Sequence, residues 1–350
     1  CHIAEKMQNL GAGISCRYRV DYCSGFENIA SDLAIVRPTL MLSVPRLWEK
    51  MVEGVNAKIA SGKGLKKKLA VWAFGVGKNY LEQKYDRGAP SAWLQIQYNI
   101  AHKLVFSKIK LAMGVDRVEL AASGAAALPA HVCKWFNMIG IDILEVFGQT
   151  ESSGIICMTE PGVESSGTVG RPVEGTEFKI ADDGEILTKG KTVFNGYYKN
   201  DEATSQTVID GWLHSGDLGK LNDQGLIQII GRKKEIMKTS GGKMVAPVPI
   251  EEQIKLSNLV GQACMVGDGR KYFTMLITLA ENISHDESIN NKVQEHITSI
   301  NDTLAGYEQI KYFKILPNDF SIESGELTPT MKMKRAIIEK NFENQINDMY

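Results

Sequence analysis

The sequence predicts an α/β protein in two parts: a larger domain with mixed α/β sheets and a small β region at its end, followed by a small α+β domain. Three observations lead to this expectation. Strand-like apolar runs alternate with helical periodicity in 28–58 and 118–148, hairpin signals dominate beyond Gly167, and a compact α+β pattern follows Arg232. Polar residues succeed an apolar run at 232–234, so we place the domains at 1–232 and 233–350.

In the first part, we expect a helix to end near Val36, because Arg37-Pro38 breaks it. The apolar run TLMLSV then predicts a buried strand, and Pro45 opens an amphipathic helix. The second α/β stretch has VELAASG as a strand, a helix over 130–139, and ILEVFG as the next strand.

The stretch between them, 58–110, carries eleven Lys and Arg residues against Glu82 and Asp86 alone, with aromatic residues interleaved. One interpretation is a solvated basic helical hairpin. A second is a patch that rests on an anionic membrane surface, where an enzyme can meet a lipid substrate. A third interpretation is a surface that binds nucleic acid, which we favour least of the three.

Beyond Gly167, two hairpins are expected: TEFKI and EILTKG around ADDG, and LGKL and LIQII around NDQG. After Arg232 we expect a helix from Pro249 and a hairpin, QACMV–GDGR–KYFTMLITL. Helical segments over 286–306, the strand KYFKIL and a single terminal helix complete the small domain.

Composition restricts the class of protein. The chain has 350 residues, 43% of them hydrophobic and 23% charged, and a net charge of −1, which is ordinary for a soluble protein and gives no argument for nucleic acid. Its six cysteines show neither metal-site spacing nor a disulfide framework, which favours a reducing cytoplasm. The chain starts at Cys1 without an initiator Met or a signal-peptide pattern, so we expect the C-terminal part of a longer protein.

The loop after ILEV reads Phe147-Gly148-Gln149-Thr150-Glu151. Ligands of open α/β sheets bind outside the carboxyl ends of the strands. An aromatic ring there can stack on a base, a hydroxyl can bond a phosphate oxygen, and a carboxylate can hold Mg²⁺. The alternative is an ordinary polar turn.

A second strand end reads SGAAALP, over 123–129. Small residues let a flat purine approach the backbone, although a tight turn before a helix would have the same composition.

Two further places hold charged candidates. Asp217 lies in a Gly-flanked turn and Arg232 ends an apolar run. These two side chains either bind a ribose through hydrogen bonds or form a structural ion pair between hairpins. Lys332 follows Pro329, which fixes a turn, in a polar loop; taken alone, such a lysine is usually a surface residue.

Together these motifs resemble the acyl-adenylate-forming superfamily over essentially the whole chain, and within it the long-chain fatty acyl-CoA synthetases. The segments that carry the resemblance are SVPRLWEK, GTVGRPV, VFNGYYKNDEAT, GWLHSGDLG, GRKKEIMKTSGGK and LTPTMKMKR. Fatty acyl-AMP ligases, aryl-CoA ligases and peptide-synthetase domains share most of these motifs. A non-catalytic fragment that binds nucleotide or membrane is the alternative from another class.

The resemblance implies a partial large adenylate-forming domain followed by a mobile lid domain, and it implies a role for each candidate. Nucleotide contacts would come from Gly124, Ala125, Ala126, Phe147, Gly148, Gln149, Thr150, Asp217 and Arg232. Catalysis would involve Lys332, Thr150 and Glu151, with Glu151 as the metal ligand. Lys234 would be the hinge, and Ser240, Gly241, Gly242 and Lys243 would face coenzyme A.

The implied reaction activates a long-chain fatty acid with ATP and Mg²⁺ and transfers the acyl group to coenzyme A. The family's Ser/Thr/Gly-rich phosphate loop is absent from the chain and belongs upstream of it. We therefore assign the reaction to the complete protein, in the cytoplasm. Peripheral contact at the inner face of a membrane is the alternative in which 58–110 rests on lipid and is not merely a solvated hairpin.

Overall fold

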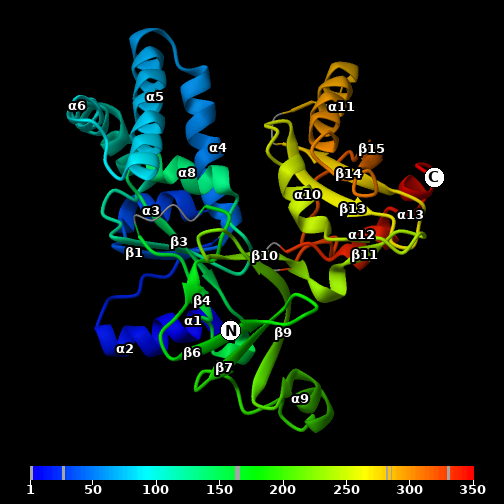
Figure 1. The fold of residues 1–350 in the computed structure, drawn as a ribbon. Coiled ribbons are helices and arrows are strands. Elements are labelled where there is room, and N and C mark those ends of the chain that lie inside the picture. The colour runs from blue at the N-terminus through cyan, green and yellow to red at the C-terminus, as the bar shows by residue number, and fades with distance from the viewer. Residues whose placement is uncertain (1–2, 26–27, 162–165, 281–282, 285, 329–331) are drawn as a thin grey trace. The chain divides into compact units, whose positions relative to one another are not determined.

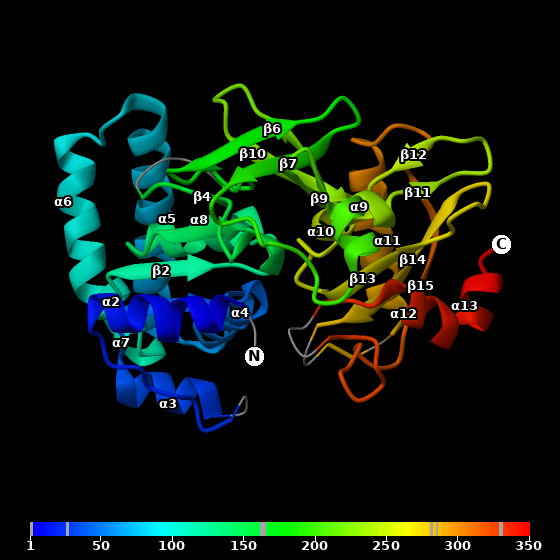
Figure 2. The same cartoon turned by 90° about the horizontal axis from the view of Figure 1, so that it is seen from below.

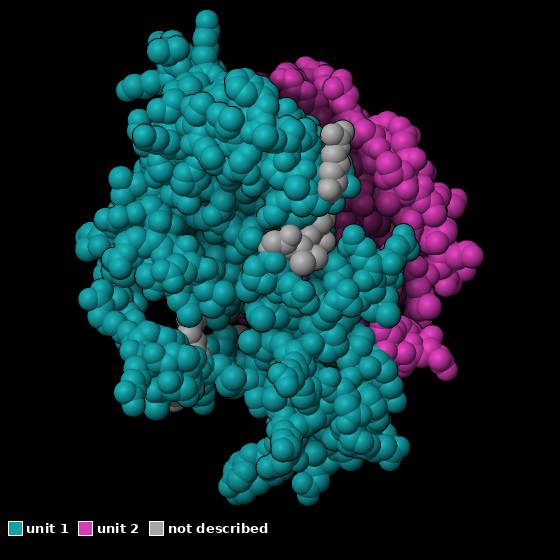
Figure 3. All heavy atoms as spheres, turned by 60° about the vertical axis from the view of Figure 1, so that its left-hand side comes forward, with its two compact units in different colours: residues 1–179, 187–215, 221–228 teal, residues 180–186, 216–220, 229–350 magenta. Residues whose placement is uncertain are grey.

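The computed structural model describes all residues except 1–2, 26–27, 162–165, 281–282, 285 and 329–331. The chain divides into two compact units (Figure 3): residues 1–179, 187–215 and 221–228 form the first, and residues 180–186, 216–220 and 229–350 the second. The second unit thus takes short segments from before residue 232, so the division of the sequence into 1–232 and 233–350 stays a prediction.

The first unit opens with short helical pieces, α1 (Ile3–Glu5), the π-helical η1 (Lys6–Ala12) and α2 (Gly13–Cys16), followed by α3 (Ile29–Val36). Helix α3 ends where expected, because Arg37 adopts a left-handed conformation with φ 49° and Pro38 follows it. Arg37 is also paired with Asp116, which fixes this end of the helix.

A five-stranded sheet forms the frame of the first unit (Figure 1). Its order is β1 (Leu40–Ser43), β2 (Leu120–Ser123), β3 (Ile143–Phe147), β4 (Cys157–Met158) and β5 (Arg171–Pro172). Strands β1, β2 and β3 are parallel and the last two antiparallel, which makes the sheet mixed as predicted.

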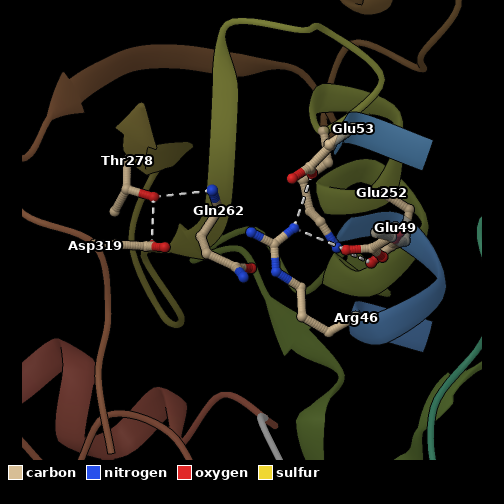
Figure 4. Close-up of polar contacts among 8 residues, drawn as sticks. Arg46, Glu49, Glu53, Glu252, Gln262, Thr278 and Asp319 are labelled. Atoms are coloured by element: carbon tan, nitrogen blue, oxygen red, sulfur yellow. Dashed lines mark hydrogen bonds and ion pairs between the residues drawn. The ribbon is translucent and has the colours of Figure 1, made fainter. Parts of the chain in front are cut away.

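Parallel neighbours need crossover helices. Helix α8 (Ala130–Met138) connects β2 to β3, and α4 (Pro45–Ser61) begins the crossover from β1 to β2, opening at Pro45 as expected. The fully buried Trp48 and Phe136 meet edge to face with ring centroids 5.1 Å apart. In α4, the half-buried Arg46 forms ion pairs with the half-buried Glu49 and with the exposed carboxylate of Glu53 (Figure 4).

The basic segment forms helices, as predicted: α5 (Gly64–Arg87), α6 (Ala92–Ala101), η3 (His102–Phe106) and α7 (Ser107–Met113). Helices α5 and α6 lie side by side (Figure 1 and Figure 2), and the rings of Tyr80 and Tyr98 stack between them at 4.0 Å. Gly88 ends α5 at φ 77°, and the Ser91 hydroxyl caps α6 by accepting from Leu94 N. Among the described residues, no helix combines the length and apolar character needed to cross a bilayer.

Both expected hairpins are strands of a second sheet, with the order β10-β9-β7-β6 and β8 paired to β9. The bounds are β6 (Thr176–Ile180), β7 (Glu185–Gly190), β8 (Val208–Ile209), β9 (Trp212–Leu221) and β10 (Ile227–Arg232). Helix α9 (Asp201–Thr207) precedes β8, and its cap Asn200 accepts from Ala203 N.

The second unit contains the predicted α+β pattern. Its elements are η5 (Lys233–Glu235), β11 (Met237–Lys238), β12 (Met244–Val245), α10 (Pro247–Ile254), β13 (Val260–Val266), β14 (Phe273–Leu279), α11 (Glu287–Asn301), β15 (Ile310–Ile315), α12 (Arg335–Asn341) and α13 (Glu343–Asn347). Strand β14 pairs antiparallel with β13 and parallel with β15, and fully buried Phe273 and Ile277 form its core with Ile254 of α10.

Two expectations for this unit were wrong in detail. Helix α10 begins at Pro247 instead of Pro249, since a proline fits the first helical position, where no N–H is needed. The expected single terminal helix is divided at Phe342 into α12 and α13.

A side-chain hydrogen-bond chain crosses strands β13 and β14 of this unit. The Thr278 hydroxyl of β14 accepts from Gln262 N of β13 at 2.9 Å and donates to Asp319 at 2.7 Å (Figure 4).

Candidate active site

Two candidate loops leave the first sheet at the same edge. Ser123 of β2 and Glu145 of β3 are register partners in parallel strands, so the carboxyl ends of both strands point the same way. The loops 124–129 and 148–154 follow directly. This edge is where open α/β sheets bind ligands. A cavity of about 350 Å³ in the same unit lies elsewhere, at the amino ends of these strands, with Tyr98 and Asp142 in its lining.

The small-residue loop is fixed at both ends. Gly124 N donates to Ser43 O at 3.1 Å, and Leu128, which is 2% exposed, donates its N–H to the Glu145 carboxyl at 3.1 Å. Between these points Ala125 has φ 72°, a left-handed conformation that non-glycine residues seldom adopt. The loop therefore holds a defined backbone path with only methyl-sized side chains along it.

The loop after β3 has a shape that requires glycine at position 148. A Cβ atom there would lie 1.7 Å from Gly154 O. The turn is closed by the Ser152 hydroxyl, which donates to Gln149 O at 2.9 Å, and by Gly154 N, which donates to the same oxygen at 3.0 Å. Phe147 is half-buried at the end of β3, and Thr150 is exposed at the start of η4 (Thr150–Ser152).

Glu151 has a partner that the sequence did not reveal. The Tyr197 hydroxyl donates to Glu151 Oε1 at 2.7 Å. Burial, and then this hydrogen bond, raise the pKa of Tyr197. The motif VFNGYYKNDEAT supported the resemblance, but nothing in it assigns Tyr197 to a carboxylate 46 residues away.

The protein side chains near Glu151 could supply only some of the ligands of a magnesium ion. Among the described residues there is no group of three or more His, Cys, Asp or Glu side chains that could hold a metal. Mg²⁺ is usually held through one or two carboxylates together with substrate phosphates, and it keeps several waters. The half-buried Glu151 carboxylate, with one oxygen in a hydrogen bond, fits such a site.

In the second unit, Asp217 and Arg232 form an ion pair. Arg232 Nε lies 2.9 Å from Asp217 Oδ1, and the aspartate side chain is 7% exposed against 46% for the arginine. Burial raises the pKa of Asp217 to about 6, while the charges of Arg232 and Lys332 oppose the shift. The aspartate is therefore mainly ionised at pH 7, with an arginine that remains accessible.

Lys332 lies close enough to this pair for its charge to act on both residues. Burial lowers the pKa of Lys332 most, and repulsion from Arg232 lowers it further, against the attraction of Asp217 and Glu235. The lysine backbone is fixed, because Lys332 N donates to Thr328 Oγ1 at 2.9 Å and Thr328 N donates to Lys332 O at 2.8 Å. Pro329, expected to fix the turn, lies outside the described residues.

The Gly-Gly loop is a closed turn between β11 and β12. Thr239 N donates to Lys243 O at 2.9 Å, and Gly242 takes φ 80°. Ser240, Gly241, Gly242 and Lys243 are all exposed. Lys234, the expected hinge, is exposed in η5 directly after β10.

The mixed sheet with polar loops at its carboxyl edge, and the acid–arginine pair beside a lysine, favour the class of nucleotide-binding proteins. The chain belongs to the AMP-binding enzyme family: the family model matches residues 2–198, and the model of the AMP-binding enzyme C-terminal domain matches residues 234–350. The predicted superfamily and fold class are thereby confirmed.

Curated relatives are named as long-chain fatty acid ligases. The chain is 34% identical, over 97% of its length, to the long-chain-fatty-acid–CoA ligase FadD15 of Mycobacterium bovis, and covers 59% of that protein. It is 33% identical, over 92% of its length, to the long-chain-fatty-acid–CoA ligase ACSBG2 of Xenopus laevis, and covers 49% of it. The chain thus spans about half to three fifths of the length of these two relatives.

Solved structures show the same fold at lower identity. The adenylation domain of a carboxylate reductase from Mycobacterium chelonae matches with a TM-score of 0.67 and 22% identity, covering 94% of this chain and 49% of that one. The anthranilate CoA ligase AuaEII matches with a TM-score of 0.63 and 21% identity, and the match covers 91% of this chain and 53% of that one. At this identity the likeness shows the fold alone.

Proposed function

We propose that the complete protein is an AMP-forming long-chain fatty acid–CoA ligase. It would convert a fatty acid and ATP to an acyl-adenylate and pyrophosphate, and then transfer the acyl group to coenzyme A with release of AMP. The observation that carries the proposal is the group Asp217, Arg232 and Lys332, in which a buried carboxylate faces two cations. The relatives named as long-chain ligases supply the substrate class.

In the first step, a carboxylate oxygen attacks the α-phosphorus of ATP and the bond to pyrophosphate breaks. Negative charge grows around the phosphorus, so donors and cations must be aimed there. Lys332 supplies a cation and Thr150 a hydroxyl donor, while Glu151 would hold Mg²⁺. The ion, when bound, would neutralise phosphate charge.

The remaining residues would hold the nucleotide. Gly124, Ala125 and Ala126 offer a backbone edge with small side chains against which a purine ring fits, and Phe147 can stack on it. Gly148 and Gln149 shape the loop that presents Thr150. Asp217 would accept hydrogen bonds from the ribose hydroxyls, with Arg232 donating to the same sugar.

In the second step, the coenzyme A thiol attacks the acyl carbon, a thioester forms, and AMP leaves. Charge now departs with AMP, and Lys332 is no longer required. Ser240, Gly241, Gly242 and Lys243 form an exposed turn that would face the pantetheine arm. We propose Lys234 as the hinge at which the small domain turns between the two steps.

The test is ATP–pyrophosphate exchange by the complete protein with carboxylic acids of graded chain length. A long-chain ligase exchanges with long-chain acids and hardly with short-chain acids or benzoate, because only the long chain fills its apolar site. A preference for aryl acids would show that the substrate is an aryl acid and not a long-chain fatty acid. Exchange with no acid would favour a non-catalytic nucleotide-binding protein.

We also propose that the hairpin α5–α6 rests on an anionic membrane surface. Trp93, Ile96 and Ile100 follow one face of α6 at helical spacing and are 68%, 51% and 45% exposed. Exposed lysines at 66–68 of α5 supply positive charge. Segments that lie in a lipid interface combine exposed apolar and cationic side chains.

Co-sedimentation with phosphatidylglycerol–phosphatidylcholine vesicles tests this surface. Trp93→Ser with Ile100→Ser should reduce the bound fraction several-fold, and salt should reduce it in the parent protein. Ile35→Ser, at an apolar residue of α3 that is 80% exposed, is the matched control. Equal loss with the control, or no loss with the double variant, would refute the membrane role.

A further inference from the structure

We propose that Tyr197 is a positioning residue for the Glu151 carboxylate, which its hydroxyl holds in the orientation used to bind a divalent cation. The proposal rests on the proposed function, which makes Glu151 the metal ligand. It adds a residue for which neither the sequence motif nor the family match gives a role.

The carboxylate is held by a segment from a distant part of the chain. Tyr197 OH donates to Glu151 Oε1 at 2.7 Å, and Phe194 N donates to the backbone oxygen of the same glutamate at 2.8 Å. One residue beyond the short helix η4, the Ser153 hydroxyl donates to Thr192 O at 2.7 Å. Three hydrogen bonds therefore join 151–153 to 192–197, and one of them reaches the functional group itself.

The segment that presents the hydroxyl is itself fixed. Tyr197 N donates to Thr204 Oγ1 at 2.9 Å, and the rings of Phe194 and Tyr197 meet edge to face at 4.8 Å. Gly196 has φ 142°, and a Cβ atom there would lie 2.6 Å from Thr204 Cγ2. Because the backbone cannot shift easily at this point, the hydroxyl oxygen has a defined place.

A hydrogen bond to one carboxylate oxygen restricts the rotamers of the glutamate and leaves Oε2 for a cation. In known metal sites the ligating carboxylates are themselves hydrogen-bonded, and removing such a partner lowers metal affinity or activity by about 10- to 100-fold. A phenylalanine in place of Tyr197 keeps the ring contact with Phe194 and removes the hydroxyl, which donates to Glu151 and is also hydrogen-bonded to the Thr207 side chain.

The neighbouring Tyr198 offers a matched control. It is 88% exposed, against 36% for Tyr197, and the Lys199 ammonium lies 5.2 Å from its ring centroid. Tyr198→Phe removes the same hydroxyl from the adjacent position without touching Glu151.

The experiment compares the complete protein with its Tyr197→Phe, Tyr198→Phe and Glu151→Gln variants. Binding of Mn²⁺ in the presence of α,β-methylene-ATP is followed by the EPR signal of free Mn²⁺, and the Mg²⁺ requirement of ATP–pyrophosphate exchange is titrated. We expect Tyr197→Phe to weaken Mn²⁺ binding about tenfold or more, and to raise the Mg²⁺ concentration for half-maximal exchange while saturating Mg²⁺ restores most of the rate. Tyr198→Phe should match the parent protein.

Thioester formation from synthetic acyl-AMP separates positioning from folding, and Tyr197→Phe should leave it intact. If Tyr197→Phe reduces both half-reactions equally, or leaves Mn²⁺ binding unchanged while Glu151→Gln weakens it, the role of Tyr197 is overturned and the ligase assignment stands. If Glu151→Gln also leaves Mn²⁺ binding unchanged, Glu151 is not the metal ligand and the role of Tyr197 falls with it. ATP–pyrophosphate exchange by the parent protein tests the ligase reaction separately.

Discussion

Glu145 of β3 and Asp217 of β9 are both buried acids, 4% and 5% exposed, but their surroundings differ. Burial raises the pKa of Glu145 to about 8, with a single backbone hydrogen bond from Leu128 opposing the shift. Burial raises the pKa of Asp217 only to about 6, because Arg232 and Lys332 oppose it. At neutral pH the first acid is therefore mainly protonated and the second mainly ionised.

This difference separates a structural acid from one that can bind substrate. A protonated Glu145 holds the end of the small-residue loop through Leu128 N and avoids an unpaired buried charge. An ionised Asp217 is an acceptor suited to sugar hydroxyls. Burial alone thus does not indicate a functional carboxylate; the cations around it decide.

The largest effect is expected from removing one of the cations near Asp217. Lys332→Ala in the complete protein should reduce adenylate formation by at least 10²–10³-fold, since it removes a positive charge needed where negative charge develops. Thioester formation from synthetic acyl-AMP should remain. Half-reaction assays measure both rates, and equal loss of the two would contradict the assignment.

The second prediction concerns Glu145, the buried acid whose pKa no cation among the described residues lowers. Because the folded pKa of Glu145 lies above the unfolded value of 4.5, the native state binds the extra proton, and stability falls as pH rises from about 5 to 8. Glu145→Gln should remove this contribution, roughly 4 kcal/mol over that range.

Urea unfolding of the parent protein and of Glu145→Gln at pH 5 and at pH 8.5 measures this difference. As the pH rises from 5 to 8.5, the unfolding free energy of the parent protein should fall relative to that of Glu145→Gln. If the difference between the two unfolding free energies is the same at both pH values, Glu145 is ionised at both, like Asp217. The contrast between the two acids would then be wrong.

The third prediction concerns the paired acid. Asp217→Asn should weaken ATP binding about 10- to 100-fold, because charged hydrogen bonds to the ribose are lost and Arg232 loses its partner. Equilibrium dialysis with labelled ATP measures the affinity, and Asp223→Asn, in the hairpin turn after β9, is a matched control. An unchanged affinity would refute the ribose role.

The same carboxylate gives this binding a pH dependence. With a pKa of about 6, Asp217 takes up a proton as the pH falls, so the affinity for adenosine should drop roughly tenfold between pH 7.5 and pH 5. Adenosine is the useful probe, because it has no phosphate that titrates in this range. Asp217→Asn should bind adenosine weakly at both pH values.

The smallest effect is expected beside Glu145. The Ser123 hydroxyl is buried without a hydrogen-bond partner among the described residues. Ser123→Ala removes an unsatisfied polar group, so the protein should be unchanged or up to about 1 kcal/mol more stable. Thermal unfolding measures the change; a clear loss of stability would mean that the hydroxyl is satisfied after all.

Local patterns were enough to predict most of the frame. The apolar runs TLMLSV, VELAASG and ILEVFG predicted strands, which the structure has at 40–43, 120–123 and 143–147, and Asp183-Gly184 predicted the β6–β7 turn. The structure also brings Asp217, Arg232 and Lys332 together, and their roles stay predictions.

Contacts between distant segments could not be read in this way. The bond from Tyr197 to Glu151 joins residues 46 apart, and the interaction of Glu145 with Leu128 depends on how a loop folds back onto its neighbouring strand. Neither pair has a spacing that marks it. The start of α10 was misplaced for a local reason, since both Pro247 and Pro249 lie in its first turn.

Gly148 places a limit on how the loop after β3 can diverge. With no room for even one methyl group against Gly154 O, the backbone path of this loop is fixed by main-chain packing. The side chain of its neighbour Gln149 helps to close the same turn, because it accepts a hydrogen bond from the backbone N–H of Ser152. A change at either position would therefore alter where the loop presents the Thr150 hydroxyl.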